Sequence, residues 1–242
     1  GSLLMSVAVF GVGFIMRPLG SMVLGAYADR VGRKAAMLMT IVLMGVGTAL
    51  IAFAPTHAQI GVLAPVLIVV GRLIQGFAAG GEVGSATTLL LESAGANQRG
   101  FFVSWQAISQ GISALLGASL GLALTYFLPE QALYAWGWRV PFILSAALVL
   151  IGLYVRVSLH ETPVFAKVAK AGKQVKVPLG TLLSKHLKAT ILGTFIMLAT
   201  YTLFYLMTVY SMTYGTAPQP LGLGYSRNSF LWMLMVAVIG FG

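Results

Sequence analysis

The chain has 242 residues, of which 58% are hydrophobic and 8% are charged, with a formal net charge of +10 at pH 7 and no cysteine. Soluble domains carry about 25% charged residues and could not bury this much apolar surface, so the composition predicts an all-α polytopic membrane protein. The absence of cysteine excludes disulfides and thiol chemistry. The basic residues lie mostly in predicted loops, which favours lipid headgroups over nucleic acid as their partner.

Apolar runs long enough to cross a membrane recur along the chain, since a spanning helix needs about 20 mostly apolar residues. The runs lack the period-two alternation of barrel strands, which indicates helices. We expect seven segments, at residues 3–28, 35–54, 61–91, 101–127, 138–155, 187–214 and 229–242. The last segment is too short to span a bilayer.

The connections between these segments alternate in charge. The first, third and fifth connections hold eleven Lys or Arg residues, whereas the others hold two. Cytoplasmic loops are enriched in Lys and Arg, so the first, third and fifth connections are predicted to be cytoplasmic. The N-terminus then faces outward, and we expect a further helix upstream.

Residues 157–186 form the only long connection, which is basic and polar. We interpret them as a solvated cytoplasmic linker, with an amphipathic helix on the inner leaflet as the alternative for part of it. The linker divides the chain into residues 1–156 and residues 187–242.

Ionisable side chains occur inside the predicted spans at Arg17, Arg72 and Glu82. Each costs at least ~2.5–3.5 kcal/mol in hydrocarbon, so such groups persist where they face water, a partner or a ligand. Arg17 lies about 12 residues, or ~18 Å along a helix, from the charged loop, which favours a role facing a cavity over snorkelling. Both roles stay open for Arg72. Glu82 is either a proton carrier or an anion neutralised by a cation from another helix.

Other polar side chains follow helical spacing within the spans. At 100° per residue, Gln75 shares a stripe with Arg72 and Glu82, beside a stripe of small residues that favours close helix packing. The small residues are Gly76, Gly80 and Gly84. In the fourth segment, Gln106 and Gln110 share a face, for which interhelical hydrogen bonding and substrate contact are both open. In the sixth segment, we predict Tyr201 and Tyr205 as ligand contacts.

Sequence motifs of catalysis are missing. There is no glycine-rich phosphate loop, no zinc-protease motif and no nucleophile elbow, and the three histidines form no cluster. The polar groups within the predicted helices therefore favour transport of a solute over its chemical conversion. We therefore predict a protein that is no enzyme, with no cofactor and no metal.

The run GAYADRVGRK at residues 25–34 resembles the loop signature of the major facilitator superfamily, between its second and third helices. Further motifs resemble the metabolite:proton symporter branch, which includes carriers of shikimate, 2-oxoglutarate, citrate, and proline or betaine. These motifs are RPLG at 17–20, RLIQG at 72–76, GGEVG at 80–84, GWRVPF at 137–142 and HETPVF at 160–165. By this resemblance, the chain is an incomplete fragment that covers family helices two to eight.

The resemblance implies a monomeric secondary transporter of the bacterial inner membrane, in which two six-helix halves rock around a central site. It would carry a small carboxylate or zwitterionic metabolite with protons. The predicted substrate and proton pathway comprises Arg17, Arg72, Gln75, Glu82, Gln106, Gln110, Tyr201 and Tyr205.

The resemblance also implies a cytoplasmic gate, in which the loop acid Asp29 contacts the end of a helix of the other half. The predicted gate residues are Gly25, Asp29, Arg30, Gly32, Arg33, Lys34, Glu92 and Arg99. The alternatives are a sugar porter, whose glutamine-rich motif is missing from residues 201–214, and a drug/proton antiporter, which needs neither RPLG nor ETPVF. From another class, a non-transporting scaffold or receptor stays open.

Overall fold

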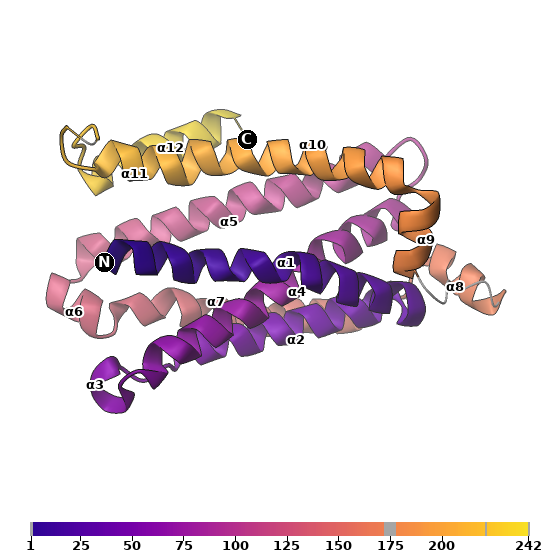
Figure 1. Ribbon diagram of the computed structural model, residues 1–242, viewed down its shortest axis with the longest axis horizontal. Helices are drawn as coiled ribbons and strands as arrows, with labels where there is room; N and C mark the ends of the chain where they lie inside the picture. The colour runs from indigo at the N-terminus through magenta and orange to yellow at the C-terminus, as the bar shows by residue number, and fades with distance from the viewer. Residues whose placement is uncertain (1, 172–177, 221, 242) are drawn as a thin grey trace. The chain divides into compact units, whose positions relative to one another are not determined.

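The computed structural model describes residues 2–171, 178–220 and 222–241, and helices dominate them (Figure 1). The long helices are α1 (Ser2–Val31), α2 (Arg33–Ala52), α4 (Leu63–Ser93), α5 (Arg99–Phe127), α7 (Val140–Ser158), α10 (Leu187–Tyr205) and α12 (Arg227–Phe241). The short elements are α3 (His57–Ile60), α6 (Glu130–Ala135), the 3-10 turn η1 (Gly137–Arg139), α8 (Pro163–Lys170), α9 (Pro178–Lys185), the π-helical turn η2 (Leu206–Tyr210) and α11 (Ser211–Thr216).

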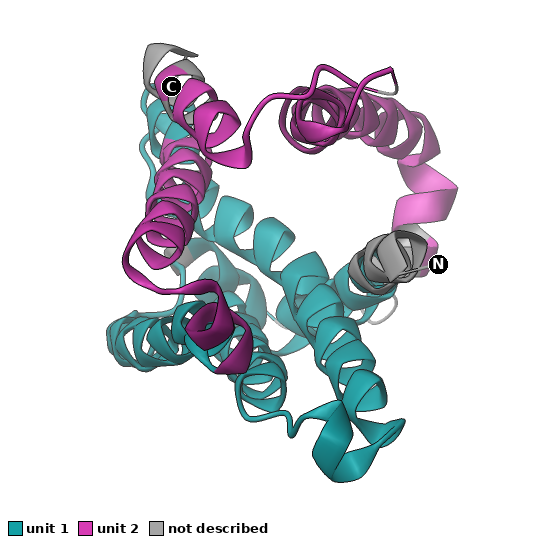
Figure 2. Cartoon of the chain, turned by 90° about the vertical axis from the view of Figure 1, so that its left-hand side faces the viewer, with its two compact units in different colours: residues 1–104, 136–179 teal, residues 105–135, 180–242 magenta. Residues whose placement is uncertain are grey.

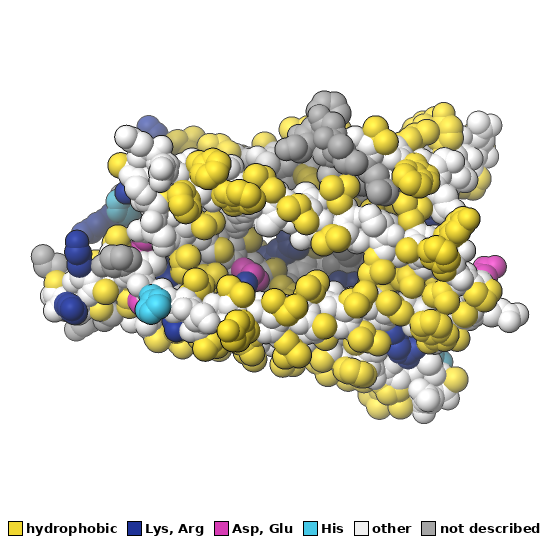
Figure 3. Space-filling view, turned by 180° about the vertical axis from the view of Figure 1, so that it is seen from behind, with side chains coloured by type: hydrophobic (Ala, Val, Ile, Leu, Met, Phe, Trp, Pro, Cys, Tyr) yellow, Lys and Arg dark blue, Asp and Glu magenta, His cyan; other side chains and the backbone are white. Residues whose placement is uncertain are grey.

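Five stretches of the described chain are long and apolar enough to cross a membrane, and they coincide with the second to sixth predicted segments. They are Arg33–Ala52, Leu63–Ser93, Arg99–Phe127, Gly137–Ser158 and Leu187–Thr216. The first predicted segment lies within the 30-residue helix α1, and the described part of the last, residues 229–241, lies in the 15-residue helix α12. Large apolar side chains remain exposed along these helices, and Figure 3 shows them over most of the visible face.

The sixth predicted segment is confirmed as a stretch that can cross a membrane, and it contains a π-helical turn. The chain passes from α10 through η2 into α11, and Ser211 Oγ donates to the carbonyl of Leu206, five residues earlier, at 2.9 Å. A π turn holds one residue more than an α turn, and hydrophobic periodicity does not reveal it.

The chain divides into two compact units, coloured in Figure 2. Unit 1 comprises residues 1–104 and 136–179, and unit 2 comprises residues 105–135 and 180–242. The predicted linker, residues 157–186, contributes to both units and contains α8 and α9. Its residues 172–177 lie outside the described residues. The predicted division into transporter halves stays a prediction.

In unit 1, α1 and α2 pack against α4, and α7 packs against α2. The core side chains are small or aliphatic, as in Ala36, Ile41 and Ala78. Beyond the end of α2, Arg139 donates to the carbonyl of Ala54 at 3.0 Å, which ties the start of α7 to α2. In unit 2, α11 packs against α12.

Candidate functional site

A single glycine forms the turn between α1 and α2. Gly32 has φ 129°, a conformation that favours glycine over residues with a side chain. A Cβ atom at this position would also lie 2.2 Å from Oε2 of Glu161. Gly32 therefore permits both the turn and the approach of Glu161 to the start of α2.

The carboxylate of Glu161 caps the first turn of α2. It accepts hydrogen bonds from the backbone N–H groups of Arg33, at 3.0 Å, and Lys34, at 3.2 Å. The first N–H groups of a helix have no partner within the helix, and an anion is favourable at this end. Lys34 Nζ adds a hydrogen bond to the carbonyl of Val157 at 2.7 Å, at the end of α7.

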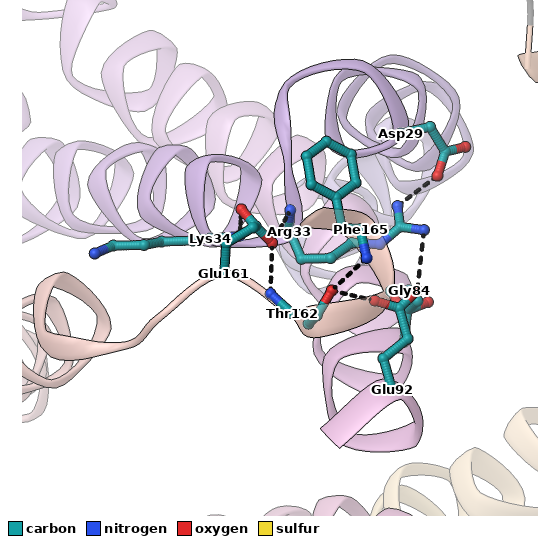
Figure 4. Close-up of polar contacts among 9 residues, drawn as sticks. Asp29, Arg33, Lys34, Gly84, Glu92, Glu161, Thr162 and Phe165 are labelled. Carbon is teal, nitrogen blue, oxygen red and sulfur yellow. Dashed lines mark hydrogen bonds and ion pairs between the residues drawn. The ribbon is translucent and has the colours of Figure 1, made fainter. Parts of the chain in front are cut away.

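The guanidinium group of Arg33 joins carboxylates from two helices. It forms an ion pair with Asp29 on α1 and a second, at 3.6 Å, with Glu92 on α4 (Figure 4). Glu92 also accepts a hydrogen bond from the hydroxyl group of Thr162, which caps the start of α8 by accepting from Phe165 N. These contacts bind the ends of α1, α2, α4 and α8 together. We call Asp29, Arg33, Glu92, Glu161 and Thr162 the charge cluster.

The other predicted gate residues are Gly25, Arg30, Gly32, Lys34 and Arg99, and Gly32 forms the turn described above. Lys34 is part of the contacts above, and Arg30 and Arg99 are exposed. Arg99 forms no ion pair with the described residues of the charge cluster. Gly25 lines a cavity beside the cluster.

The cavity lies between α1 and α4 and has a volume of about 190 Å³. Its lining residues are Ser21, Gly25, Ala28, Asp29, Arg33, Gly80, Gly81, Gly84, Ser85 and Thr88. Ser85 Oγ and Arg33 Nε are buried, and neither has a hydrogen-bond partner among the described residues. Because buried polar atoms are normally paired, the cavity is suited to a polar occupant.

Glycines bring the backbones of α1 and α4 together along the span. A Cβ atom at Gly76 would lie 1.9 Å from the carbonyl oxygen of Gly13, and one at Gly80 would lie 2.0 Å from that of Arg17. A Cβ atom at Gly84 would meet nothing within 4 Å. The predicted small-residue stripe therefore packs at two of its three positions, and the third opens into the cavity.

This packing fixes the backbones of Arg17 and Arg72. A Cβ atom at Gly13 would lie 3.2 Å from the carbonyl oxygen of Arg72, so α1 and α4 are also close at this level. Arg17 lies about one helical turn, ~6 Å along the axis, beyond Gly13. Arg72 donates to Gln75 at 3.3 Å, and Gln75 donates to Thr48 of α2 at 2.9 Å. Arg17 lies over the Phe14 ring, and its Nε atom is buried without a hydrogen-bond partner. Neither arginine forms an ion pair with a described carboxylate.

Glu82 forms an ion pair with Arg156 of α7. The remaining predicted pathway residues, Gln106, Gln110, Tyr201 and Tyr205, belong to unit 2. Gln110 is exposed and the other three are half-exposed. Their role in binding stays a prediction.

Sequence reasoning missed three of the residues that make these contacts: Arg156, Glu161 and Thr162. The predicted fifth segment, 138–155, ended just before Arg156, although α7 continues to Ser158. The Thr162-Pro163 pair is a usual helix start, with a capping hydroxyl before Pro, and it could have indicated α8. No sequence signal pairs Glu161 with the start of α2.

Groups of three or more metal-ligating side chains are missing from the described residues. Unit 1 does hold cations inside its spans and, beside the charge cluster, a cavity lined in part by polar side chains.

Comparisons with known proteins agree on one class. The family described as "Sugar (and other) transporter" matches residues 2–176. The "Inner membrane metabolite transport protein YhjE" of Escherichia coli (strain K12) is 54% identical over 239 residues, which are 99% of this chain and 54% of that protein. The "Citrate-proton symporter" of Salmonella typhi is 39% identical over 99% of this chain and 54% of its own length.

The "Shikimate transporter" of Escherichia coli (strain K12) is 36% identical over 94% of this chain and 52% of its own length. The chain thus spans about half the length of these curated relatives. A solved structure of the major facilitator superfamily proton:xylose symporter XylE superposes with a TM-score of 0.71 at 18% identity, over 95% of this chain and 55% of that chain. At this identity, the likeness shows the fold alone.

Proposed function

We propose that the protein moves a small organic metabolite across a membrane together with protons, because the chain belongs to the sugar (and other) transporter family of the major facilitator superfamily. The chain is a multi-pass membrane protein of this fold. Its bacterial relatives, one named as an inner membrane protein, support the same location here. Alternating access between two halves of a longer protein is part of the proposal.

The proposal rests mainly on Arg17 and Arg72, two cations without a described carboxylate partner. Both cations lie within α1 and α4, and neither has a carboxylate partner among the described residues. A cation in a span needs an anion or water, because its desolvation is costly. A substrate carboxylate would supply that anion. The names of the citrate and shikimate carriers among the relatives support an organic acid, and a zwitterion also carries the required group.

The charge cluster and the neighbouring cavity are proposed as the cytoplasmic gate. Asp29 lies at the rim of the cavity, with its side chain 39% exposed, so it is accessible to the end of a helix of the other half. A carboxylate at a helix N-terminus contributes roughly 0.3–1 kcal/mol. Since such a contact exists in one conformation only, it would shift the equilibrium between the two states.

Uptake into proteoliposomes tests the proposed function. The full-length protein is reconstituted, and uptake of organic acids, betaines and neutral sugars is measured with and without an inward proton gradient. We expect accumulation of an organic acid or zwitterion that stops when a protonophore collapses the gradient. Arg17→Ala should raise the KM at least tenfold, whereas the exposed Arg227→Ala should leave it unchanged. Accumulation of neutral sugars alone, or unchanged affinity in Arg17→Ala, would contradict the proposal.

A further inference from the structure

One side chain of α7 reaches two other helices of unit 1. The guanidinium group of Arg156 forms an ion pair with Glu82 of α4, and it donates to the Met37 carbonyl of α2 at 2.8 Å and to Thr40 Oγ at 3.2 Å. The side chain of Arg156 is 14% exposed and that of Glu82 is 30% exposed. Arg156 therefore connects α2, α4 and α7 at one point within the spans.

The surroundings hold this arrangement in place. Thr40 is fully buried, and its hydroxyl group donates to the same Met37 carbonyl at 2.9 Å, which leaves its oxygen free to accept from Arg156. Nearby, Val149 of α7 packs at Gly45 of α2, and Ile41 of α2 packs at Gly152 of α7. The guanidinium group thus meets an acceptor set that packing between α2 and α7 has already positioned.

The pairing makes Glu82 part of the contacts that hold unit 1 together. Arginine stays charged at all physiological pH values. Without the negative charge of Glu82, Arg156 would be a largely buried cation with only neutral acceptors, which is strongly unfavourable. Glu82 therefore serves as the counter-charge of Arg156 at the point where α2, α4 and α7 meet.

We propose that Arg156 is the positioning residue of Glu82. Their ion pair fastens α4 to α2 and α7 throughout the transport cycle, and the coupled proton binds elsewhere. The first part concerns the fold of unit 1 alone. The second part rests on the proposed proton-coupled transport, and the two parts are tested by different measurements.

Thermal unfolding in detergent tests the ion pair. Glu82→Gln or Arg156→Gln alone leaves one charge without its partner and should lower the unfolding midpoint by about 10 °C. The double variant E82Q/R156Q removes both charges and should recover at least half of that loss. Glu130→Gln, at an exposed carboxylate of α6, should change nothing. Full stability in Glu82→Gln, or a double variant no better than the single ones, would overturn the pairing.

Transport by E82Q/R156Q tests the proton. Substrate exchange without a gradient reports binding and conformational change, and accumulation driven by a proton gradient reports coupling. We expect both to stay within about twofold of the unmodified protein, with an unchanged pH profile. A double variant that exchanges substrate but no longer accumulates it would show that Glu82 carries the coupled proton. If the unmodified protein transports nothing, the proposed function fails, while the unfolding series still decides the pairing.

Discussion

The charge cluster and the two arginines Arg17 and Arg72 differ in whether unit 1 supplies partners of opposite charge. In the cluster, Asp29, Glu92 and Glu161 each have a described partner. The guanidinium group of Arg33 pairs with Asp29 and Glu92, and its backbone N–H donates to Glu161. In the spans, Arg17 and Arg72 have no described carboxylate. Both regions use the same chemistry, but the first fastens helices to one another and the second lacks an anion. We propose that the charges of the cluster hold the fold and that those of Arg17 and Arg72 bind a ligand.

The close contact of α1 and α4 supports both regions, so breaking it should have the largest effect. In Gly76→Val, the new side chain would meet the backbone of Gly13, which cannot move aside as a flexible side chain can. We expect a loss of about 3 kcal/mol in the free energy of unfolding, at the upper end for overpacking. Thermal unfolding in detergent measures it.

Gly84→Ala is the matched control, because the same glycine stripe is open at that position. It should stay within about 0.5 kcal/mol of the unmodified protein. Equal losses in the two variants would show that α1 and α4 do not meet at Gly76.

Removing the cap of α2 should affect the charge cluster and spare the arginines of the spans. Glu161→Gln keeps the shape of the side chain but removes the negative charge from the start of α2. We expect a loss of about 1 kcal/mol in stability. Substrate affinity should be unchanged, since the proposed binding site is at Arg17 and Arg72. His160→Gln, at the exposed neighbouring position, serves as the control, and a KM shift in Glu161→Gln alone would remove the distinction between the two regions.

The smallest effect is expected at the edge of the cluster. Lys34→Gln removes a charged donor from the exposed hydrogen bond to the Val157 carbonyl. We expect about 0.5 kcal/mol or less, because exposed charged contacts are weak and screened. Comparing unfolding midpoints at low and high salt checks this, and a loss as large as that of Glu161→Gln would contradict it.

The sequence predicted the helices well because hydrophobic runs and basic loops are local signals. The predicted segments 35–54 and 61–91 match α2 and α4 to within about two residues at each end. The family resemblance placed Asp29, Arg33 and Glu92 together at a gate, and the structure brings these three into contact. Their role in gating is a proposal.

Contacts between distant segments could not be predicted in this way. Arg156 lies 74 residues from Glu82 and Glu161 lies 128 residues from Arg33, and nothing local in the sequence pairs them. A hydropathy reading also ended the fifth segment just before Arg156, which hid a cation that belongs to α7. The π turn η2 likewise depends on backbone geometry that composition does not encode.

The central claim is that Arg17 and Arg72 bind the carboxylate group of a substrate. The most direct test compares the binding of a transported acid with that of its neutral amide, in the unmodified protein and in Arg17→Gln. We predict that the acid binds the unmodified protein at least tenfold more tightly than the amide does, which corresponds to about 1.4 kcal/mol. In Arg17→Gln, this preference should largely disappear. An acid preference of the same size in both proteins would contradict the claim.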